Sequence, residues 1–141
     1  MSLNAPSVCV KDTGTAKGRG VFALRAFAEG EEVEAAPVLV FRTSFERLPA
    51  EVKRFVFDWA RLAGARGTHA LALGYGSMYN HSNPANLRYE ADAAARLLRF
   101  FALREVAAGE ELTINYDVAS GESEADDEYW FEMNGVTPVA D

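Results

Sequence analysis

Cysteine and histidine are scarce in this chain of 141 residues, which has one cysteine and two histidines. A single cysteine excludes an internal disulfide and a zinc site made of cysteines alone. No apolar run approaches the roughly 20 residues of a membrane span. Residues 1–6 also lack the basic head and apolar run of a secretory signal. We therefore expect no metal site, no membrane contact, and a soluble, intracellular protein.

Positive charge is also in deficit, with 14 Lys and Arg against 21 Asp and Glu and a net charge of −7. Binding to a phosphate backbone needs clustered cations, so this balance argues against nucleic acid as a direct partner. An acidic surface instead favours a basic partner and speeds its association. Surplus carboxylates that only keep a protein in solution would give the same composition, so the charge is compatible with both interpretations.

Short β-type segments separated by turns make up most of the chain. We predict a mainly β fold with few short helices, and strands over residues 8–12, 21–24, 36–41, 87–90, 97–104 and 111–116. Cys9, between two valines in the first strand, is predicted to be a buried core thiol. One helix is predicted over residues 49–63, where apolar side chains recur every three or four residues. Its aromatic stripe is interpreted as core packing.

Residues 74–86 form a polar, aromatic-bearing loop between two apolar segments, and its centre is Tyr79-Asn80-His81-Ser82. Glycine, asparagine, serine and proline all favour turns, and such loops between buried segments often carry chemistry. Two further motifs flank this loop in sequence: Gly18-Arg19-Gly20, and a stretch from Gly109 through Glu110 and Glu111 to Tyr116. A Gly-x-Gly turn lets the backbone approach a ligand closely, but it lacks the third glycine and the helix of a dinucleotide site.

These three motifs, in this order, resemble the SET-domain protein-lysine methyltransferases over roughly residues 7–117. The lack of cysteine clusters resembles the minimal bacterial and viral members. The resemblance implies a fold of several small sheets, in which the last motif passes beneath the Asn-His-Ser segment in a knot-like threading. It assigns residues 1–119 to the SET domain, with the helix at 49–63 as its insert, and residues 120–141 to a tail.

The resemblance also implies S-adenosylmethionine as cofactor, and a basic protein or peptide with a target lysine as substrate. It assigns catalysis to Tyr116, whose hydroxyl would orient the amine and the methyl group. The substrate could be histone-like, ribosomal or other. The protein would be cytoplasmic if it is bacterial, and nuclear if it acts on chromatin. The implied cofactor-binding residues are Gly18, Arg19, Gly20, Tyr79, Asn80, His81 and Trp130.

A lysine channel with aromatic walls suits the reaction, because ring faces hold the lysine stem and tolerate positive charge. We expect Tyr75, Tyr89, Ile114 and Tyr116 to line it. Ile114 stands where the family usually has Phe or Tyr, a position associated with the number of methyl groups added. The smaller side chain leaves room for higher methylation states, although Tyr89 could offset it, so the product remains open.

Two alternatives belong to other classes. A SET-fold module could bind a lysine-bearing peptide without turnover, but the intact Tyr116 and Asn80-His81 count against it. A structural β protein would need all three motifs to be coincidental. In the tail, an acidic linker precedes Tyr129, Trp130 and Phe131, which we predict to close as a lid over the cofactor and the channel. A core patch or a homodimer interface is the alternative for these rings.

Overall fold

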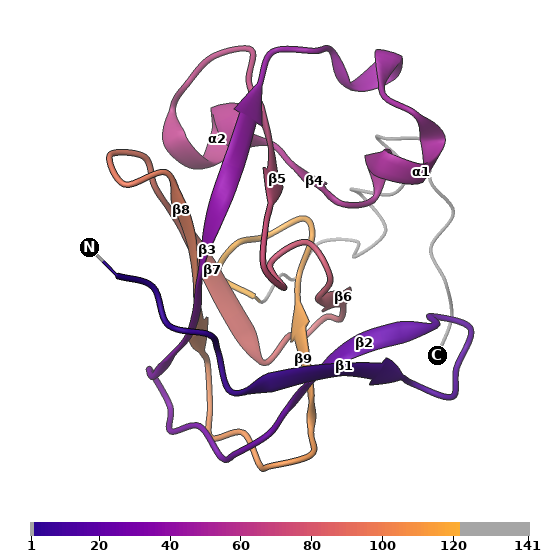
Figure 1. Ribbon diagram of the computed structural model, residues 1–141, viewed down its shortest axis with the longest axis vertical. Coiled ribbons are helices and arrows are strands. Elements are labelled where there is room, and N and C mark those ends of the chain that lie inside the picture. The colour runs from indigo at the N-terminus through magenta and orange to yellow at the C-terminus, as the bar shows by residue number, and fades with distance from the viewer. Residues whose placement is uncertain (1, 122–141) are drawn as a thin grey trace.

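Two curled β-sheets and a helical insert form the fold of the computed structural model, which describes residues 2–121 (Figure 1). The mainly β architecture with short helices confirms the fold class predicted from sequence. No helix in this part of the chain is long and apolar enough to cross a membrane. In chain order the elements are β1 (Val8–Asp12), β2 (Arg19–Ala23), β3 (Glu32–Phe41), η1 (Phe45–Arg47), α1 (Ala50–Lys53), β4 (Val56–Phe57), α2 (Trp59–Ala63), β5 (His69–Ala72), β6 (Asn80–His81), β7 (Leu87–Asp92), β8 (Leu97–Ala102) and β9 (Glu111–Ile114).

The first sheet brings the three sequence motifs together, because its strand order is β1-β2-β9-β6. Strand β9 pairs antiparallel with β2 on one side and parallel with β6 on the other. Its alternating Leu112 and Ile114 are fully buried, as the period of two in the sequence predicts. Residues more than 60 positions apart, Arg19 and Asn80, therefore lie on the two strands that flank β9.

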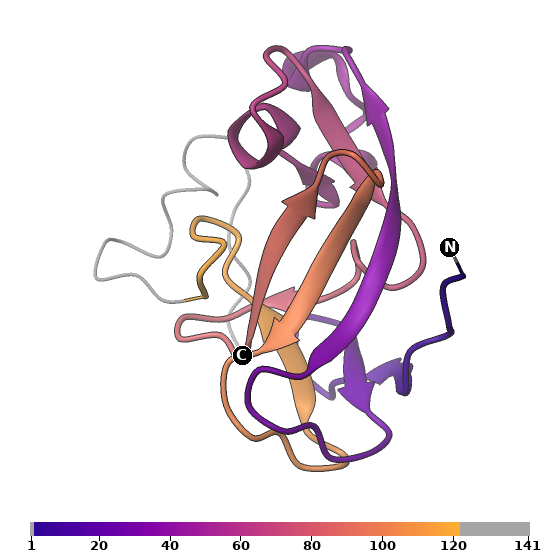
Figure 2. The same cartoon turned by 90° about the vertical axis from the view of Figure 1, so that its left-hand side faces the viewer.

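The second sheet has the order β4-β5-β3-β8-β7, and Figure 2 shows β3, β8 and β7 running side by side. Strand β8 is central in this group, and its Leu98 and Phe100 are completely buried. Phe100 packs against the rings of Tyr79 and Tyr89, at centroid distances of 4.7 and 6.0 Å. The core of this sheet therefore forms the floor beneath two of the tyrosines predicted as site residues.

After β9 the chain returns to the segment that follows β6. The Ala85 N–H donates to the Gly121 carbonyl at 3.0 Å, and the Tyr89 N–H donates to the Ala119 carbonyl at 2.9 Å. The Ser82 N–H donates to the Ile114 carbonyl at 2.9 Å. Strand β9 and the chain after it are thus bonded to residues 80–89, in line with the close passage that the resemblance implies.

The prediction of one continuous helix over residues 49–63 is wrong, because the structure has two short helices separated by β4. Val56 and Phe57 pair with Leu71 and Ala70 of β5, and β-branched and aromatic side chains favour such a strand. Pairing at the edge of the sheet therefore prevents these two residues from continuing the helix that the apolar spacing indicates. The Asp58 side chain then caps α2, and Gly64 ends it in the left-handed region at a φ of 73°.

Cys9 is half-buried rather than buried in the core. Strand β1 lies at the edge of its sheet, paired on one side with β2, and Val8 is the residue of this strand that packs inside. The prediction of a core thiol is therefore wrong, because an edge strand leaves part of its side chains in contact with solvent.

Candidate active site

A pocket of about 420 Å³, part of it open to solvent, lies between the insert and the loop at residues 74–79. One wall is β4 with α2, and the other side carries Tyr79, Tyr89 and Tyr116. We call this space the tyrosine pocket.

Tyr116 is held at both its backbone and its hydroxyl. Its N–H donates to His81 Nδ1 at 3.0 Å, and its hydroxyl donates to the Tyr79 carbonyl oxygen at 2.9 Å. The hydroxyl proton is engaged there, and a phenolic oxygen that donates can also accept a hydrogen bond. Burial raises the pKa of the Tyr116 hydroxyl to about 12, so this group is neutral at physiological pH.

Tyr89 and Ile114 complete the inner end of the pocket. The Tyr89 hydroxyl donates to the Asn115 carbonyl at 3.0 Å, and its ring meets Phe57 edge to face at a centroid distance of 5.5 Å. Burial raises the pKa of Tyr89 above its ordinary value. Ile114 is 1% exposed and still lines the pocket, so its side chain forms the inner end rather than the mouth.

Tyr79 is oriented by a buried carboxylate, that of Glu34. The Tyr79 hydroxyl donates to Glu34 Oε1 at 2.7 Å, and the Tyr75 N–H donates to Glu34 Oε2 at 2.9 Å. Burial raises the pKa of Glu34, and the two hydrogen bonds oppose that shift. The same tyrosine thus joins Glu34 through its hydroxyl and Tyr116 through its carbonyl.

The Gly-x-Gly turn and the Asn-His segment meet beside β9. Asn80 Nδ2 donates to the Arg19 carbonyl at 3.0 Å and to Glu111 Oε2 at 2.8 Å. Lys17 Nζ donates to the His81 carbonyl at 2.9 Å. These contacts join all three motifs, and the bonded residues are separated by up to 64 positions in sequence.

The two positions of the turn favour glycine for different structural reasons. Gly18 has a φ of 75°, which disfavours other residues, and a Cβ built on it would meet no atom within 4 Å. At Gly20 a Cβ would collide with the Glu111 carboxylate and lie 2.9 Å from Asn80 Nδ2. Gly20 is therefore required for the strands to close, whereas Gly18 leaves open space beside the backbone.

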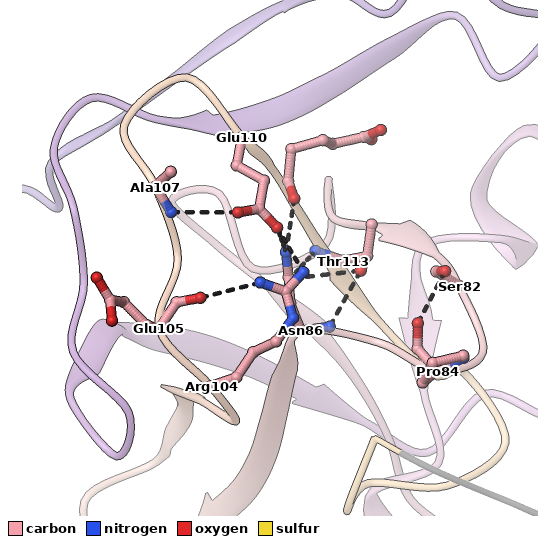
Figure 3. A network of polar contacts seen from close by, with 9 residues as sticks. Ser82, Pro84, Asn86, Arg104, Glu105, Ala107, Glu110 and Thr113 are labelled. Atoms are coloured by element: carbon pink, nitrogen blue, oxygen red, sulfur yellow. Dashed lines mark hydrogen bonds and ion pairs between the residues drawn. The ribbon is translucent and has the colours of Figure 1, made fainter.

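The loop after β6 is fastened to β9 through Asn86, as Figure 3 shows. Asn86 Nδ2 donates to the Glu111 carbonyl at 2.7 Å, while its Oδ1 accepts the Thr113 N–H at 2.7 Å. Glu110, itself paired with Arg104, accepts a longer bond from Asn86 Nδ2 at 3.3 Å. This network sets the position of β9, and hence of Tyr116, from the side away from the pocket.

Ser77 fastens the other side of the site to the insert. Its hydroxyl donates to the Phe55 carbonyl at 2.8 Å and accepts the Ala72 N–H at 2.9 Å. Ser77 therefore holds the loop that carries Tyr79 against the wall that carries Phe57, so the width of the pocket is fixed by a backbone-to-side-chain clamp.

The structure brings most of the predicted site residues into two adjoining groups. Tyr89, Ile114 and Tyr116 line the tyrosine pocket, as does Tyr79, which was predicted for the cofactor. Tyr75 is not among the lining residues and lies instead on the Glu34 side of the loop. Trp130 and the predicted aromatic lid lie outside the described residues. The second group, around the Gly-x-Gly turn, comprises Gly18, Arg19, Gly20, Asn80 and His81.

Sequence reasoning missed Glu34, Ser77, and the residues of the insert that line the pocket. Glu34 follows Val33, and both are buried because the pairing of β3 with β8 shifts register at this point. Such a bulge breaks the alternation from which burial is read in a strand. Among residues 2–121 no group of three side chains is placed to hold a metal ion.

Comparisons with known proteins agree on one family. The family model described as SET domain matches residues 18–117. A Schizosaccharomyces pombe protein named histone-lysine N-methyltransferase, H3 lysine-37 specific, is 34% identical over 123 residues, which is 87% of this chain and 76% of that protein.

Solved structures show the same fold at lower identity. A candidate histone methyltransferase of Plasmodium falciparum superposes with a TM-score of 0.61 at 20% identity, covering 77% of this chain and 91% of that one. The polycomb repressive complex 2 of Chaetomium thermophilum contains a chain that superposes with a TM-score of 0.64 at 21% identity. That match covers 80% of this chain but only 15% of the matched chain, which is much longer.

Proposed function

This chain belongs to the SET-domain family and is a protein-lysine methyltransferase, and we propose that it methylates the target lysine inside the tyrosine pocket. The observation that carries the proposal is the placement of the Tyr116 hydroxyl, which is fixed by the Tyr79 carbonyl and faces a pocket walled by aromatic rings.

S-adenosylmethionine is the methyl donor of the family, and when bound it supplies an electrophilic methyl group on a positively charged sulfur. The residues around the Gly-x-Gly turn fit such a group. Open space lies beside the backbone of Gly18, and the exposed Arg19 offers a cation for a carboxylate. We propose that Gly18, Arg19, Gly20, Asn80 and His81 hold the cofactor.

The pocket would hold the lysine side chain by its stem. The rings of Phe57 and Tyr89 and the apolar surface of Ile114 exclude water from the amine. Desolvation disfavours the ammonium form, and a neutral amine is the species that can attack a methyl group. The pocket can therefore both select the side chain and favour its reactive form.

Tyr116 would direct the amine rather than take its proton. Its hydroxyl donates to Tyr79, its pKa is raised to about 12, and a phenolic oxygen of this kind can accept an N–H of the bound amine. This hydrogen bond points the nitrogen lone pair toward the methyl group. Alignment of two bound reactants can supply about 7–11 kcal/mol of the barrier.

The substrate is a protein with a lysine side chain, and the relative named for histone H3 makes histones the first panel to test. The full chain is incubated with S-adenosylmethionine carrying a labelled methyl group and a panel of histones and ribosomal proteins. Labelled lysines are then mapped by mass spectrometry. A reaction without enzyme and one with the Tyr116→Phe variant serve as controls. Label on any lysine that depends on Tyr116 supports the proposal; label on other residue types, or none, contradicts it.

A further inference from the structure

The net charge of the chain is unevenly distributed. Residues 122–141 contain seven Asp and Glu and no Lys or Arg, so residues 1–121 hold 14 charges of each sign. Within this balanced part, residues 42–66, which we call the basic insert, carry six cations and three anions. The surface beside the tyrosine pocket is therefore positive in a chain that is acidic overall. The six cations are Arg42, Arg47, Lys53, Arg54, Arg61 and Arg66.

The cations of the basic insert differ in their partners from four arginines elsewhere in the chain. Salt bridges hold Arg25, Arg88, Arg99 and Arg104 to carboxylates, and all four lie outside the insert. Within residues 2–121, none of the six insert cations makes an ion pair. Arg54 and Lys53 lie over the rings of Phe55 and Phe45 at 5.6 and 5.3 Å, contacts that leave their positive charge in place. The charges of the insert are thus not neutralised by carboxylates of residues 2–121.

Two of these arginines lie at the rim of the tyrosine pocket. Arg54 precedes β4 and Arg61 belongs to α2, so they flank the wall formed by Val56 and Phe57. Both side chains are exposed, and their charges reach the site. Arg54 lowers the pKa of Tyr116 and Arg61 that of Tyr89, against the larger effect of burial and the opposing charges of Glu111 and Asp117.

One carboxylate shares this rim, that of Asp58. Its Oδ1 accepts the Arg61 N–H at 3.2 Å as the cap of α2, so part of its hydrogen-bonding capacity is used by the helix. Two cations against one anion leave the rim positive. Residues that flank a lysine inserted into the pocket must pass over this rim.

Resting on the proposed function, we propose that Arg54 and Arg61 select lysines with an acidic residue a few positions away in the substrate. A carboxylate at the rim would meet a complementary charge, while a neighbouring Lys or Arg would be repelled. This inference replaces the expectation, drawn from the total charge, that a basic segment is favoured. The acidic surplus that suggested it lies wholly in residues 122–141.

The test uses two synthetic peptides with one central lysine, flanked by glutamates in the first and by glutamines in the second. Binding to the full chain is measured by fluorescence anisotropy, and methylation by mass spectrometry. We expect the glutamate peptide to bind more tightly to the wild type, and each of Arg54→Gln and Arg61→Gln to reduce that preference about two- to fivefold, the range of exposed ion pairs. The preference should also shrink at high salt.

Arg88→Gln is the matched control, since it removes the same charge from a half-buried arginine that pairs with Glu90 outside the insert. Equal binding of both peptides, or an equal loss of preference in Arg88→Gln, would overturn the inference. Binding with the expected preference but without methylation would contradict the proposed function and leave the inference standing.

Two other occupants are distinguished in the same assay. A duplex DNA oligonucleotide that binds the arginines more tightly than the glutamate peptide would assign the rim to phosphate groups and overturn the inference. So would a marked gain in affinity for the glutamate peptide when Asp126, Asp127 and Glu128 are replaced together by Asn, Asn and Gln. That gain would show that the chain's own acidic residues occupy the rim.

Discussion

The hydroxyl of Tyr116 lies 2.9 Å from the carbonyl oxygen of Tyr79, and this hydrogen bond links the end of the C-terminal motif to the start of the Asn-His-Ser segment. The bond fixes the direction of the phenolic lone pairs. It also makes the geometry of the site depend on whatever holds the loop of Tyr79, namely Glu34 and Ser77.

Replacing Tyr116 with Phe should remove most methyl transfer while the fold and the affinity for S-adenosylmethionine remain nearly unchanged. The hydroxyl acts chiefly in the transition state, so kcat and kcat/KM should fall together, by about a hundredfold, as when one preorganised hydrogen-bonding group is lost. Steady-state kinetics with calorimetric cofactor binding measure both. A variant that turns over at nearly the wild-type rate would remove Tyr116 from catalysis.

Replacing Asn80 with Ala should weaken cofactor binding about tenfold, the equivalent of one hydrogen bond of about 1.4 kcal/mol. Asn80 joins the Gly-x-Gly turn to Glu111, so its loss frees the turn and leaves the carboxylate without this donor. Calorimetric titration measures the affinity. Asn86→Ala is the control, because Asn86 fastens β9 from outside the site and should lower the stability more than the cofactor affinity.

Replacing Glu34 with Gln should change how stability depends on pH. Burial raises the pKa of Glu34 in the folded protein, so the folded state holds its proton more tightly than the unfolded state does. The wild type should therefore lose unfolding free energy relative to the variant as pH rises above the ordinary pKa of a carboxyl group, until the folded-state pKa is passed. Urea unfolding of both proteins between pH 4 and 8 measures this difference. A difference independent of pH would contradict a titrating Glu34.

The same variant should also reduce kcat, because the amide of Gln offers one oxygen where the carboxylate offers two, and Tyr79 and Tyr75 each use one. The effect on KM for the cofactor should be smaller, since Glu34 acts through Tyr79 on Tyr116. Equal changes in kcat and in both KM values would indicate a general loss of structure.

Replacing Ile114 with Phe should shift the product toward lower methylation states. Ile114 is at the inner end of the pocket, so a larger ring takes space that added methyl groups would occupy. Overpacking of this buried position should also cost about 1–3 kcal/mol of stability. Mass spectrometry of the mono-, di- and trimethylated products measures the shift, and Ile114→Val, which enlarges the space, is the control. An unchanged product distribution would assign the limit to Tyr89.

The ordered motifs, through the resemblance, predicted that the last motif passes along the Asn-His-Ser segment, where β9 pairs with β6. The pairing of β9 with β2 was not predicted. The spacing of apolar residues alone gave a wrong prediction at the insert. It indicated one helix over residues 49–63, but Val56 and Phe57 form a strand that pairs with β5. Glu34 could not be predicted, because its burial depends on a shifted register in β3 that no sequence period reveals. Tyr75 lies in the same loop as Tyr79 and was expected in the channel, yet it lies on the Glu34 side of the loop, away from the tyrosine pocket.

The parallel pairing of β6 with β9 has a consequence for the order in which the site can form. A ribosome delivers β1 to β8 before Tyr116 and Gly121 leave the exit tunnel, and until then the Asn80–His81 strand lacks the neighbour that aligns it. Contacts between such distant residues form slowly, because the chain must first close a large loop. The nascent protein should thus acquire cofactor affinity only once β9 has emerged and paired with β6.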